Sequence, residues 1–168
     1  MKKVMLEVKP FQETLHSDMC GPASLKIVFD YYGLEKSEQE LAQLAEVVNG
    51  IGAGDRDLVH VAETLGFKTF VKNESDFSDI EMWLAKGVPV IVDWFTRGRT
   101  EYPLAEMADG HYSVVVGLDD EKIYLQDPEI GGLREIARND FMKVWFDFAG
   151  EYIKAEELIL RQMIAVYK

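Results

Sequence analysis

The chain contains little cysteine, little positive charge and no long apolar run. Its single cysteine, Cys20, excludes an intrachain disulfide and leaves one free thiol. Lysine and arginine number 18 against 30 aspartates and glutamates, and this net charge of −12 argues against a nucleic acid partner. No segment approaches the roughly 18 apolar residues of a membrane span. Charged residues interrupt the amino-terminal MKKVMLEVKPFQ too early for a signal peptide. We therefore expect a cytoplasmic protein with no integral membrane segment.

Apolar and aromatic residues, by contrast, are plentiful. Of 168 residues, 48% are hydrophobic, and they include 9 Phe, 7 Tyr and 3 Trp. A chain of this length and composition can bury a core without the support of disulfides or metals. We find no internal repeat, low-complexity tract or linker in the sequence. The sequence therefore predicts a single domain over residues 1–168.

The order of the predicted elements indicates an α+β fold. After a short strand near residues 5–8, the first half predicts helices over 19–32, 37–48, 55–65 and 76–86, with one strand at 67–71. Gly33 is a suitable stop for the first helix, and Ser37 with Glu40 forms a capping-box pattern at the start of the second. Later residues predict strands over 88–95, 111–118, 122–127 and 158–168, with a short helix at 139–148. Helices followed by strands favour an antiparallel sheet.

Cys20 lies where a helix is expected to begin. Proline is tolerated in the first turn of a helix, so Pro22 places the helix start close to the cysteine, with Ser17 and Asp18 as candidate caps. Free backbone N–H groups and the positive end of the helix dipole stabilise a thiolate at such a position. This setting favours a nucleophile over the alternative, a buried structural cysteine.

Three histidines are available as the base for such a nucleophile. His111 opens the strand-like run HYSVVVGL directly after a glycine, which makes it the best candidate. His60 lies beside the apolar stripe of a predicted helix and is expected to be solvated, and His16 is expected to be an ordinary surface residue. The alternative for His111 is a histidine with a structural role.

Asp127 is the candidate acceptor that orients the imidazole. It ends the strand that follows the one opened by His111, so a hairpin through LDDEK brings the two residues together. The alternative is that Asp127 and Pro128 merely start a turn. Gln12 is a further candidate, because its amide N–H and the backbone N–H of Cys20 can both donate to an oxyanion.

Taken in order, these motifs resemble those of a known family. Gln12, SDMCGPASL, YYG, GHYSVVVG and a DP pair followed by two glycines are similar to the papain-like cysteine peptidases that process double-glycine leader peptides, the bacteriocin-processing peptidase family. The resemblance covers residues 8–148. It implies a papain-like cysteine proteinase fold, with a helical N-terminal half packed on an antiparallel sheet. It also implies Cys20 as nucleophile, His111 as general base and acid, Asp127 as its orienter and Gln12 as oxyanion-hole donor.

We therefore expect a cysteine peptidase that hydrolyses a peptide bond through a Cys20 acyl-enzyme, after small or double-glycine residues of a leader-type peptide. Three alternatives are an acyltransferase with the same triad, a catalytically silent peptide-binding module, and a structural domain with an inert cysteine. Family members are commonly the first domain of a membrane exporter, whereas this chain stops at Lys168. Association with an exporter is thus an open possibility.

No cofactor or metal site is expected. The glycine-rich NGIGAGD lacks the lysine of a phosphate-binding loop. Asp55, Asp57 and the pair Asp119 and Asp120 lack the spacing of a calcium loop. Residues 93–110, which lead into His111, form either the rim or lid of a site or a plain surface loop. A peptide substrate is the one partner predicted.

Overall fold

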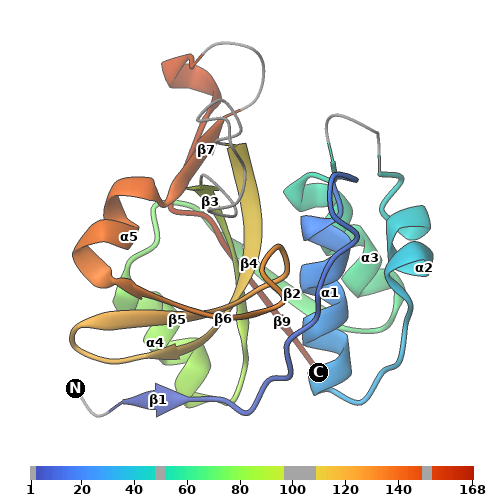
Figure 1. Ribbon diagram of the computed structural model, residues 1–168, viewed down its shortest axis with the longest axis horizontal. Helices are drawn as coiled ribbons and strands as arrows, with labels where there is room; N and C mark the ends of the chain where they lie inside the picture. The colour runs from blue at the N-terminus through green and yellow to red at the C-terminus, as the bar shows by residue number, and fades with distance from the viewer. Residues whose placement is uncertain (1–2, 48–51, 97–108, 149–152) are drawn as a thin grey trace.

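The chain folds as helices packed on both faces of an antiparallel sheet, in agreement with the predicted α+β class (Figure 1). A computed structural model describes residues 3–47, 52–96, 109–148 and 153–168. Its helices are α1 (Cys20–Tyr31), α2 (Glu38–Leu44), α3 (Asp55–Thr64), α4 (Phe77–Ala85), α5 (Arg138–Val144) and the short 3-10 helix η2 (Ala155–Glu157). Its strands are β1 (Val4–Met5), β2 (Lys68–Lys72), β3 (Val90–Thr96), β4 (Asp109–Leu118), β5 (Lys122–Asp127), β6 (Gly132–Ala137), β7 (Phe146–Phe148), β8 (Leu158–Leu160) and β9 (Met163–Tyr167).

The main sheet has the strand order β2-β9-β3-β4-β5-β6, with β1 paired to β4. All of its pairs are antiparallel. Strands β4 and β5 form the predicted hairpin, with an irregularity between Val115 and Gly117. A separate two-stranded sheet joins β7 to β8. Strand β4 therefore lies inside the main sheet, and its first residues face several elements at once.

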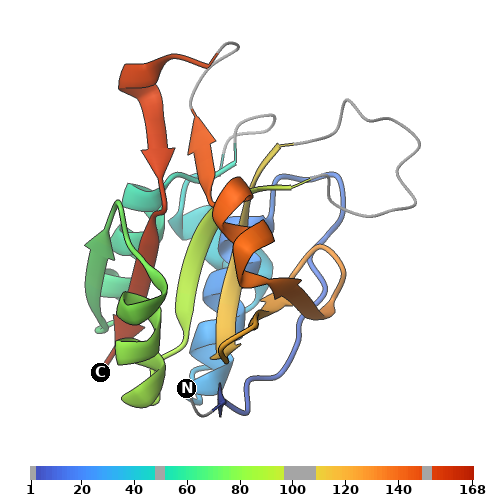
Figure 2. The same cartoon turned by 90° about the vertical axis from the view of Figure 1, so that its left-hand side faces the viewer.

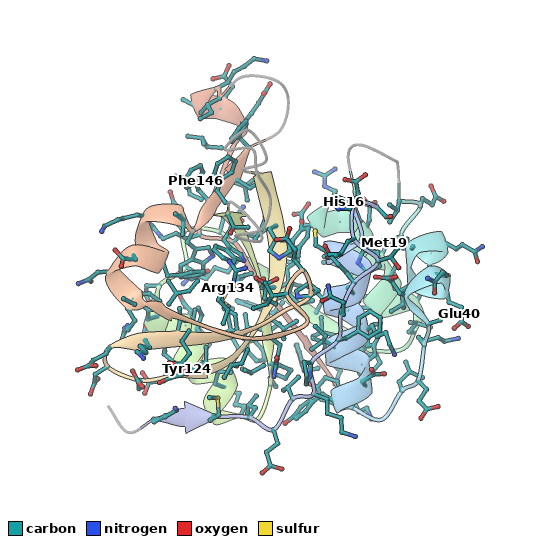
Figure 3. All side chains as sticks on the ribbon, viewed as in Figure 1. His16, Met19, Glu40, Tyr124, Arg134 and Phe146 are labelled. Carbon is teal, nitrogen blue, oxygen red and sulfur yellow. The ribbon has the colours of Figure 1, made fainter. Side chains whose placement is uncertain are left out.

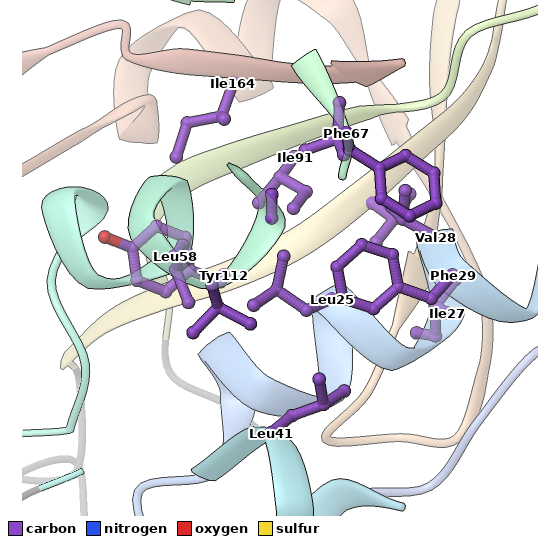
Figure 4. Close-up of a cluster of buried hydrophobic side chains, with 14 of the residues drawn as sticks. Leu25, Ile27, Val28, Phe29, Leu41, Leu58, Phe67, Ile91, Tyr112 and Ile164 are labelled. Atoms are coloured by element: carbon purple, nitrogen blue, oxygen red, sulfur yellow. The ribbon is translucent and has the colours of Figure 1, made fainter. Parts of the chain in front are cut away.

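Two apolar cores lie on opposite faces of the main sheet because alternate strand residues point to opposite sides. Figure 4 shows the first core, in which Leu25 and Phe29 of α1 and Leu58 of α3 pack against Ile91 and Tyr112 of the sheet. The second core packs α4 and α5 on the other face. Figure 2 shows α4 and α5 in front of the strands and α1 behind them. Helix α1 is thus fixed firmly against β4.

Helix α1 begins at Cys20, one residue from the predicted start. Met19 is the N-cap and makes no side-chain capping hydrogen bond, so the prediction of Ser17 or Asp18 as cap is wrong. The physical reason lies in the approach loop, where Asp18 has a left-handed backbone (φ 54°) and the Ser17 hydroxyl donates to Leu15 O. The first backbone N–H groups of α1 therefore lack the side-chain cap that was expected.

The end of α1 and the start of α2 follow the predicted capping patterns. Gly33 takes a positive φ of 76°, and its N–H donates to Asp30 O while the N–H of Leu34 donates to Phe29 O. Ser37 and Glu40 form the predicted capping box. The first signal therefore ends the helix that carries Cys20, and the second begins the next helix.

The C-terminal third departs from the prediction in three places. The predicted helix at 139–148 ends at Val144, because the buried indole N–H of Trp145 donates to Gln162 O and the following residues pair as β7 with β8. The predicted strand at 158–168 is divided into β8 and β9 at Arg161, whose φ is 47°. Strand β6 was missed because its residues alternate between exposed and half-buried positions, without an apolar run.

Two further expectations from the sequence concern residues 93–110 and membrane-spanning segments. Of the predicted rim or loop at 93–110, residues 97–108 lie outside the described part of the chain, while β3 extends to Thr96 and β4 starts at Asp109. Among the helices of the described residues, none combines the length and apolar character needed to cross a bilayer.

Candidate active site

Cys20 lies at the amino-terminal end of α1, in a half-buried position beside the start of β4. Figure 3 labels Met19 and His16 at this end of the helix. The neighbouring Gly21 is packed so tightly that an added Cβ would lie 3.1 Å from a Leu58 methyl group and 3.6 Å from the Tyr112 ring. Because Gly21 packs against α3 and β4 in this way, the helix start that carries the thiol is fixed in place.

His111 occupies the start of β4 and is almost fully buried. Its Nε2 atom lies 2.7 Å from Asp127 Oδ1, so the predicted hairpin does bring these two residues together. Burial by itself lowers the pKa of His111. Hydrogen bonds to Asp127 and to Cys20, together with the negative charges of both, outweigh burial and raise the pKa well above its usual 6.5.

The same contacts place His111 between the carboxylate and the thiol. Because Nε2 faces Asp127, the ring nitrogen left for the Cys20 thiol is Nδ1. Trp94, the register partner of His111 on β3, stacks edge-on against the imidazole with 6.0 Å between ring centroids. The imidazole is therefore oriented by a carboxylate on one edge and an aromatic ring beside it.

Asp127 is fixed by more than the histidine. Its Oδ1 also accepts the backbone N–H of Glu129 at 3.0 Å, and its Oδ2 forms an ion pair with Arg134 Nε at 2.9 Å, without hydrogen-bond geometry. Burial opposes ionisation of Asp127, but the His111 hydrogen bond and charge, followed by the Arg134 charge, lower its pKa below 3.8. The carboxylate is therefore charged, as an orienter of the imidazolium requires.

Arg134 was not anticipated from the sequence. It lies on β6, the strand that the pattern missed, and Figure 3 shows it over the sheet. Its guanidinium also lies over the Trp94 ring, 5.4 Å from the centroid. An isolated arginine in a polar strand carries no signal of this role. Pairing of β6 with β5, in which Arg134 stands opposite Leu125, brings it to the carboxylate.

Gln12 lies beside the turn that follows Asp127. Its Nε2 donates to Glu129 O at 2.7 Å and to Pro128 O at 3.0 Å, and the N–H of Glu13 donates to Pro128 O at 2.9 Å. Gly131, with φ 64°, approaches the Gln12 side chain closely. Gln12 therefore ties the segment before α1 to the turn that carries Asp127, and its amide hydrogens are directed at carbonyl oxygens.

Glu13 is a second residue that the sequence did not single out. Its Oε2 is buried, with no hydrogen-bond partner among the described residues. Burial raises the pKa of Glu13 from 4.5 to about 7; His111 lowers it, while Glu129, Asp127 and Glu38 add to the rise. This carboxyl therefore lies in the electrostatic field of the candidate catalytic pair.

The remaining question is whether these residues suit a metal. His111, Asp127 and Glu129 each offer a ligand atom, and the three atoms lie within 4.8 Å of one another. However, His111 and Asp127 are already hydrogen-bonded to each other, and the Arg134 cation occupies the other oxygen of Asp127. That arrangement suits proton transfer to and from a nucleophile better than metal coordination. His16 and His60, the other histidines, are exposed.

A cysteine at a helix start faces a histidine on an internal strand of an antiparallel sheet, and a carboxylate on the neighbouring strand holds that histidine; this arrangement defines a papain-like cysteine peptidase domain. The model of the Peptidase_C39 like family matches residues 5–153. The chain therefore belongs to this family of cysteine peptidases.

Individual proteins are similar to this chain in sequence or in fold. The chain is 31% identical over 128 residues to the transport/processing ATP-binding protein ComA of Streptococcus pneumoniae, which covers 75% of this chain but 16% of that protein. A C39-like peptidase from Bacillus anthracis has the same fold, with a TM-score of 0.71, 18% identity and coverage of 100% of this chain and 98% of that one. A double-glycine motif protease from an AMS/PCAT transporter, solved with its leader peptide, superposes with a TM-score of 0.69 at 15% identity, covering 97% and 93%.

Replacing Asp127 with asparagine is expected to lower kcat/KM by about 10²-fold or more. The upper bound is about 10⁴-fold, which is the loss for the equivalent change in a serine triad. An amide accepts a hydrogen bond from His111 but stabilises its cation less. Alkylation of Cys20 near pH 6 is therefore expected to slow as well, because less imidazolium accompanies the thiolate. Peptide cleavage and iodoacetamide labelling measure the two effects, with the exposed Asp140→Asn as control. Unchanged labelling near pH 6 would remove Asp127 from the role of orienter.

Replacing Glu13 with glutamine is expected to change how stability depends on pH. A carboxyl whose pKa is raised on folding stabilises the native state below pH 4.5, and this contribution is lost as the pH rises through about 7. The free energy of unfolding of wild type is therefore expected to fall by on the order of 2–3 kcal/mol, relative to that of Glu13→Gln, between pH 4.5 and 7.5. Urea unfolding of both proteins at these pH values measures it, with the exposed Glu35→Gln as control. A pH-independent difference would contradict the assignment.

Proposed function

We propose that the protein cleaves a peptide bond through an acyl-enzyme on Cys20, with His111 as general base and acid and Asp127 as the residue that orients it. The observation that carries the proposal is the contact series from the half-buried thiol through His111 to Asp127, in which Nε2 and Oδ1 are 2.7 Å apart. Each link serves the chemistry, because a thiolate is the nucleophile and a nearby imidazolium stabilises it.

In the first half of the reaction, His111 holds the proton of the thiol and Cys20 Sγ attacks the carbonyl carbon of the substrate. A C–S bond forms, and the carbonyl π electrons move to oxygen. When the tetrahedral intermediate collapses, the C–N bond breaks and His111 gives its proton to the leaving nitrogen. The products of this half are a thioester on Cys20 and a free amine. The negative charge of Asp127 stabilises the imidazolium throughout.

In the second half, water takes the place of the departed amine. His111 accepts a proton from the water as its oxygen attacks the thioester carbon, and the collapse of the second intermediate breaks the C–S bond. The carboxylic acid product leaves, and the thiolate and imidazolium are restored. An amine in place of water would give acyl transfer instead. The two outcomes share every step up to the thioester.

Gln12→Ala tests the proposal that Gln12 donates to the oxyanion together with the N–H of Cys20. We expect turnover to fall by about 10²–10³-fold, while alkylation of Cys20 stays close to wild type, because an oxyanion donor acts on the intermediate. For this role the Gln12 amide has to release one of the carbonyl oxygens, of Pro128 or Glu129, that it now contacts. If alkylation slows in parallel with turnover, Gln12 acts instead by positioning the turn after Asp127. Full activity would exclude both roles.

We propose substrates with small residues before the cleaved bond, Gly-Gly or Gly-Ala, in a leader-type peptide. One comparison supports this: the double-glycine motif protease with this fold was solved with a leader peptide. The net charge of −12 further favours neutral or basic sequences around the bond.

A peptide library tests this function. The protein is incubated with peptides that vary on both sides of the bond, with and without a primary amine, and the products are identified by mass spectrometry. Cleavage after small residues is the expected result. Amine adducts in place of hydrolysis would support an acyltransferase. Labelling of Cys20 without either product, for every peptide, would contradict the peptidase function, and binding without turnover would support a silent peptide-binding module.

A further inference from the structure

The Asp127 carboxylate contacts two basic side chains, one through each oxygen. His111 Nε2 lies 2.7 Å from Oδ1, and Arg134 Nε lies 2.9 Å from Oδ2. The Asp127 side chain is fully buried, whereas that of Arg134 is 20% exposed. A positive charge beside a carboxylate offsets part of the negative charge that stabilises a protonated imidazole on its other side. The Arg134 charge therefore acts on His111 through the carboxylate that both contact.

Contacts with β3 hold the Arg134 guanidinium in a defined position. Its Nη1 donates to Thr96 Oγ1 at 3.3 Å, and its central carbon lies 5.4 Å from the centroid of the Trp94 ring. Trp94 is itself fixed, because its indole N–H donates to the buried Ser113 hydroxyl at 3.0 Å. The same indole packs edge-on against the His111 ring. The positive charge is therefore held by the residues that also orient the imidazole.

The other ionisable groups beside His111 are a thiol and several carboxyls. Those whose charges act on His111, whose oxygen lies within 4.8 Å of it, or that pack against the residue before it are Cys20 of α1, Glu13 before α1, Asp93 of β3, Asp127 of β5, Glu129 in the turn after β5, and Asp147 of β7. Burial lowers the pKa of His111, but Asp127 and Cys20 raise it well above 6.5. These surroundings favour the imidazolium, and Arg134 brings a positive charge to them.

An imidazole that is too basic is a poor general acid. In the proposed reaction His111 has to give its proton to the leaving nitrogen, and such a transfer is most efficient when the pKa of the acid lies near the working pH. Burial opposes ionisation of Asp127, while His111 and then Arg134 lower its pKa below 3.8. A cation at Oδ2 therefore serves two ends. It keeps the carboxylate charged, and it reduces the excess of negative charge that acts on the imidazolium.

We propose that Arg134 is a positioning residue that keeps Asp127 ionised and limits how firmly His111 holds its proton. This inference rests on the proposed function of the Cys20, His111 and Asp127 series, and it adds a fourth side chain that adjusts that series. Lysine in place of Arg134 keeps the charge without the planar group, whereas glutamine keeps a hydrogen-bonding amide without the charge. The two variants therefore separate the effect of charge from that of shape.

Titration of the His111 ring, followed by NMR in the Cys20→Ala protein, measures the effect without chemistry at the thiol. In Arg134→Gln the midpoint is expected to rise by about one pH unit, because a charge that disfavours the imidazolium is removed. In Arg134→Lys it should rise by less than about half as much. Arg138→Gln is the matched control, because Arg138 directly follows β6 and lies over Phe77. A midpoint that stays constant or falls in Arg134→Gln would overturn the proposal.

The pH dependence of peptide cleavage gives a second readout. The alkaline limb of kcat/KM, where His111 loses its proton, is expected to move upward by about one pH unit in Arg134→Gln. Alkylation of Cys20 near pH 6 should stay within about threefold of wild type, because the imidazolium is retained. A purely structural role of Arg134 would slow this alkylation, as expected for Asp127→Asn, and would leave the limb in place. That result would overturn the proposal.

The two measurements also separate this proposal from the peptidase function. A raised His111 midpoint in Arg134→Gln, with no peptide cleaved by wild type, would retain the role of Arg134 and overturn the peptidase function. Cleavage by wild type with an unchanged midpoint would retain the function and overturn the role of Arg134. If Arg134→Gln does not fold, Arg134→Met gives the same test, because it keeps an aliphatic stem against Trp94 and lacks the charge.

Discussion

Cys20→Ala is expected to lose at least about 10⁴-fold in kcat/KM for peptide cleavage, since removing the nucleophile of a serine triad costs about 10⁶ in kcat. No other cysteine in the chain can replace it. The side chain is half-buried at a helix start, where alanine is well accommodated, so the fold should persist. Circular dichroism and thermal unfolding check the fold, and the peptide assay checks activity.

Cys20→Ser extends this test. A serine hydroxyl is similar in size but far less easily deprotonated than a thiol, so the serine variant is expected to be nearly as inactive as Cys20→Ala. Substantial activity in the alanine variant would show that the chemistry resides elsewhere. Activity in the serine variant but not in the alanine variant would show that a hydroxyl at position 20 can replace the thiolate as nucleophile.

His111→Ala is expected to slow both peptide cleavage and alkylation of Cys20, because the variant lacks the base and the cation that stabilises the thiolate. General acid–base catalysis contributes about 10²–10⁴-fold, so cleavage should fall by at least that factor. The rate of labelling should fall more near pH 6 than at higher pH, since the raised pKa of His111 keeps the imidazolium present near pH 6 in wild type. Iodoacetamide kinetics measured by intact mass provide the readout.

Two controls accompany the histidine variant. His60→Ala removes an exposed histidine of α3 and should leave both rates at wild-type values. His111→Gln keeps a group that can donate to Asp127 and protects against the loss of fold that a cavity and an unpaired carboxylate would cause. If His111→Gln folds and is alkylated as fast as wild type, His111 is not the partner of the thiol.

The central geometry was predictable because it depends on local signals. Pro22 fixes a helix start near Cys20, and the β4-β5 hairpin follows from two apolar runs joined by a short polar turn. The hairpin then determines that His111 and Asp127 meet. None of these steps requires knowledge of how the helices pack on the sheet, and for that reason the sequence was sufficient.

The support of that geometry was not predictable. Arg134 reaches Asp127 through the pairing of β5 with β6, a strand without an apolar pattern. Glu13 and Asp93 look like ordinary acidic residues, and their burial results from tertiary packing alone. Likewise, the sequence predicted a helix over the residues of β7, where pairing with β8 outweighs the local propensity. Long-range pairing and burial are the properties that a single sequence encodes most weakly.

The rate of iodoacetamide labelling at pH 6, compared between the native and the urea-unfolded protein, tests the central claim most directly. The chain has one cysteine, so every adduct reports on Cys20. Because His111 and the start of α1 are expected to stabilise the thiolate in the folded state, we expect the native protein to react at least about tenfold faster than the unfolded chain, whose thiol has neither partner. A native protein that reacts more slowly than the unfolded chain would contradict the account and identify Cys20 as a structural residue.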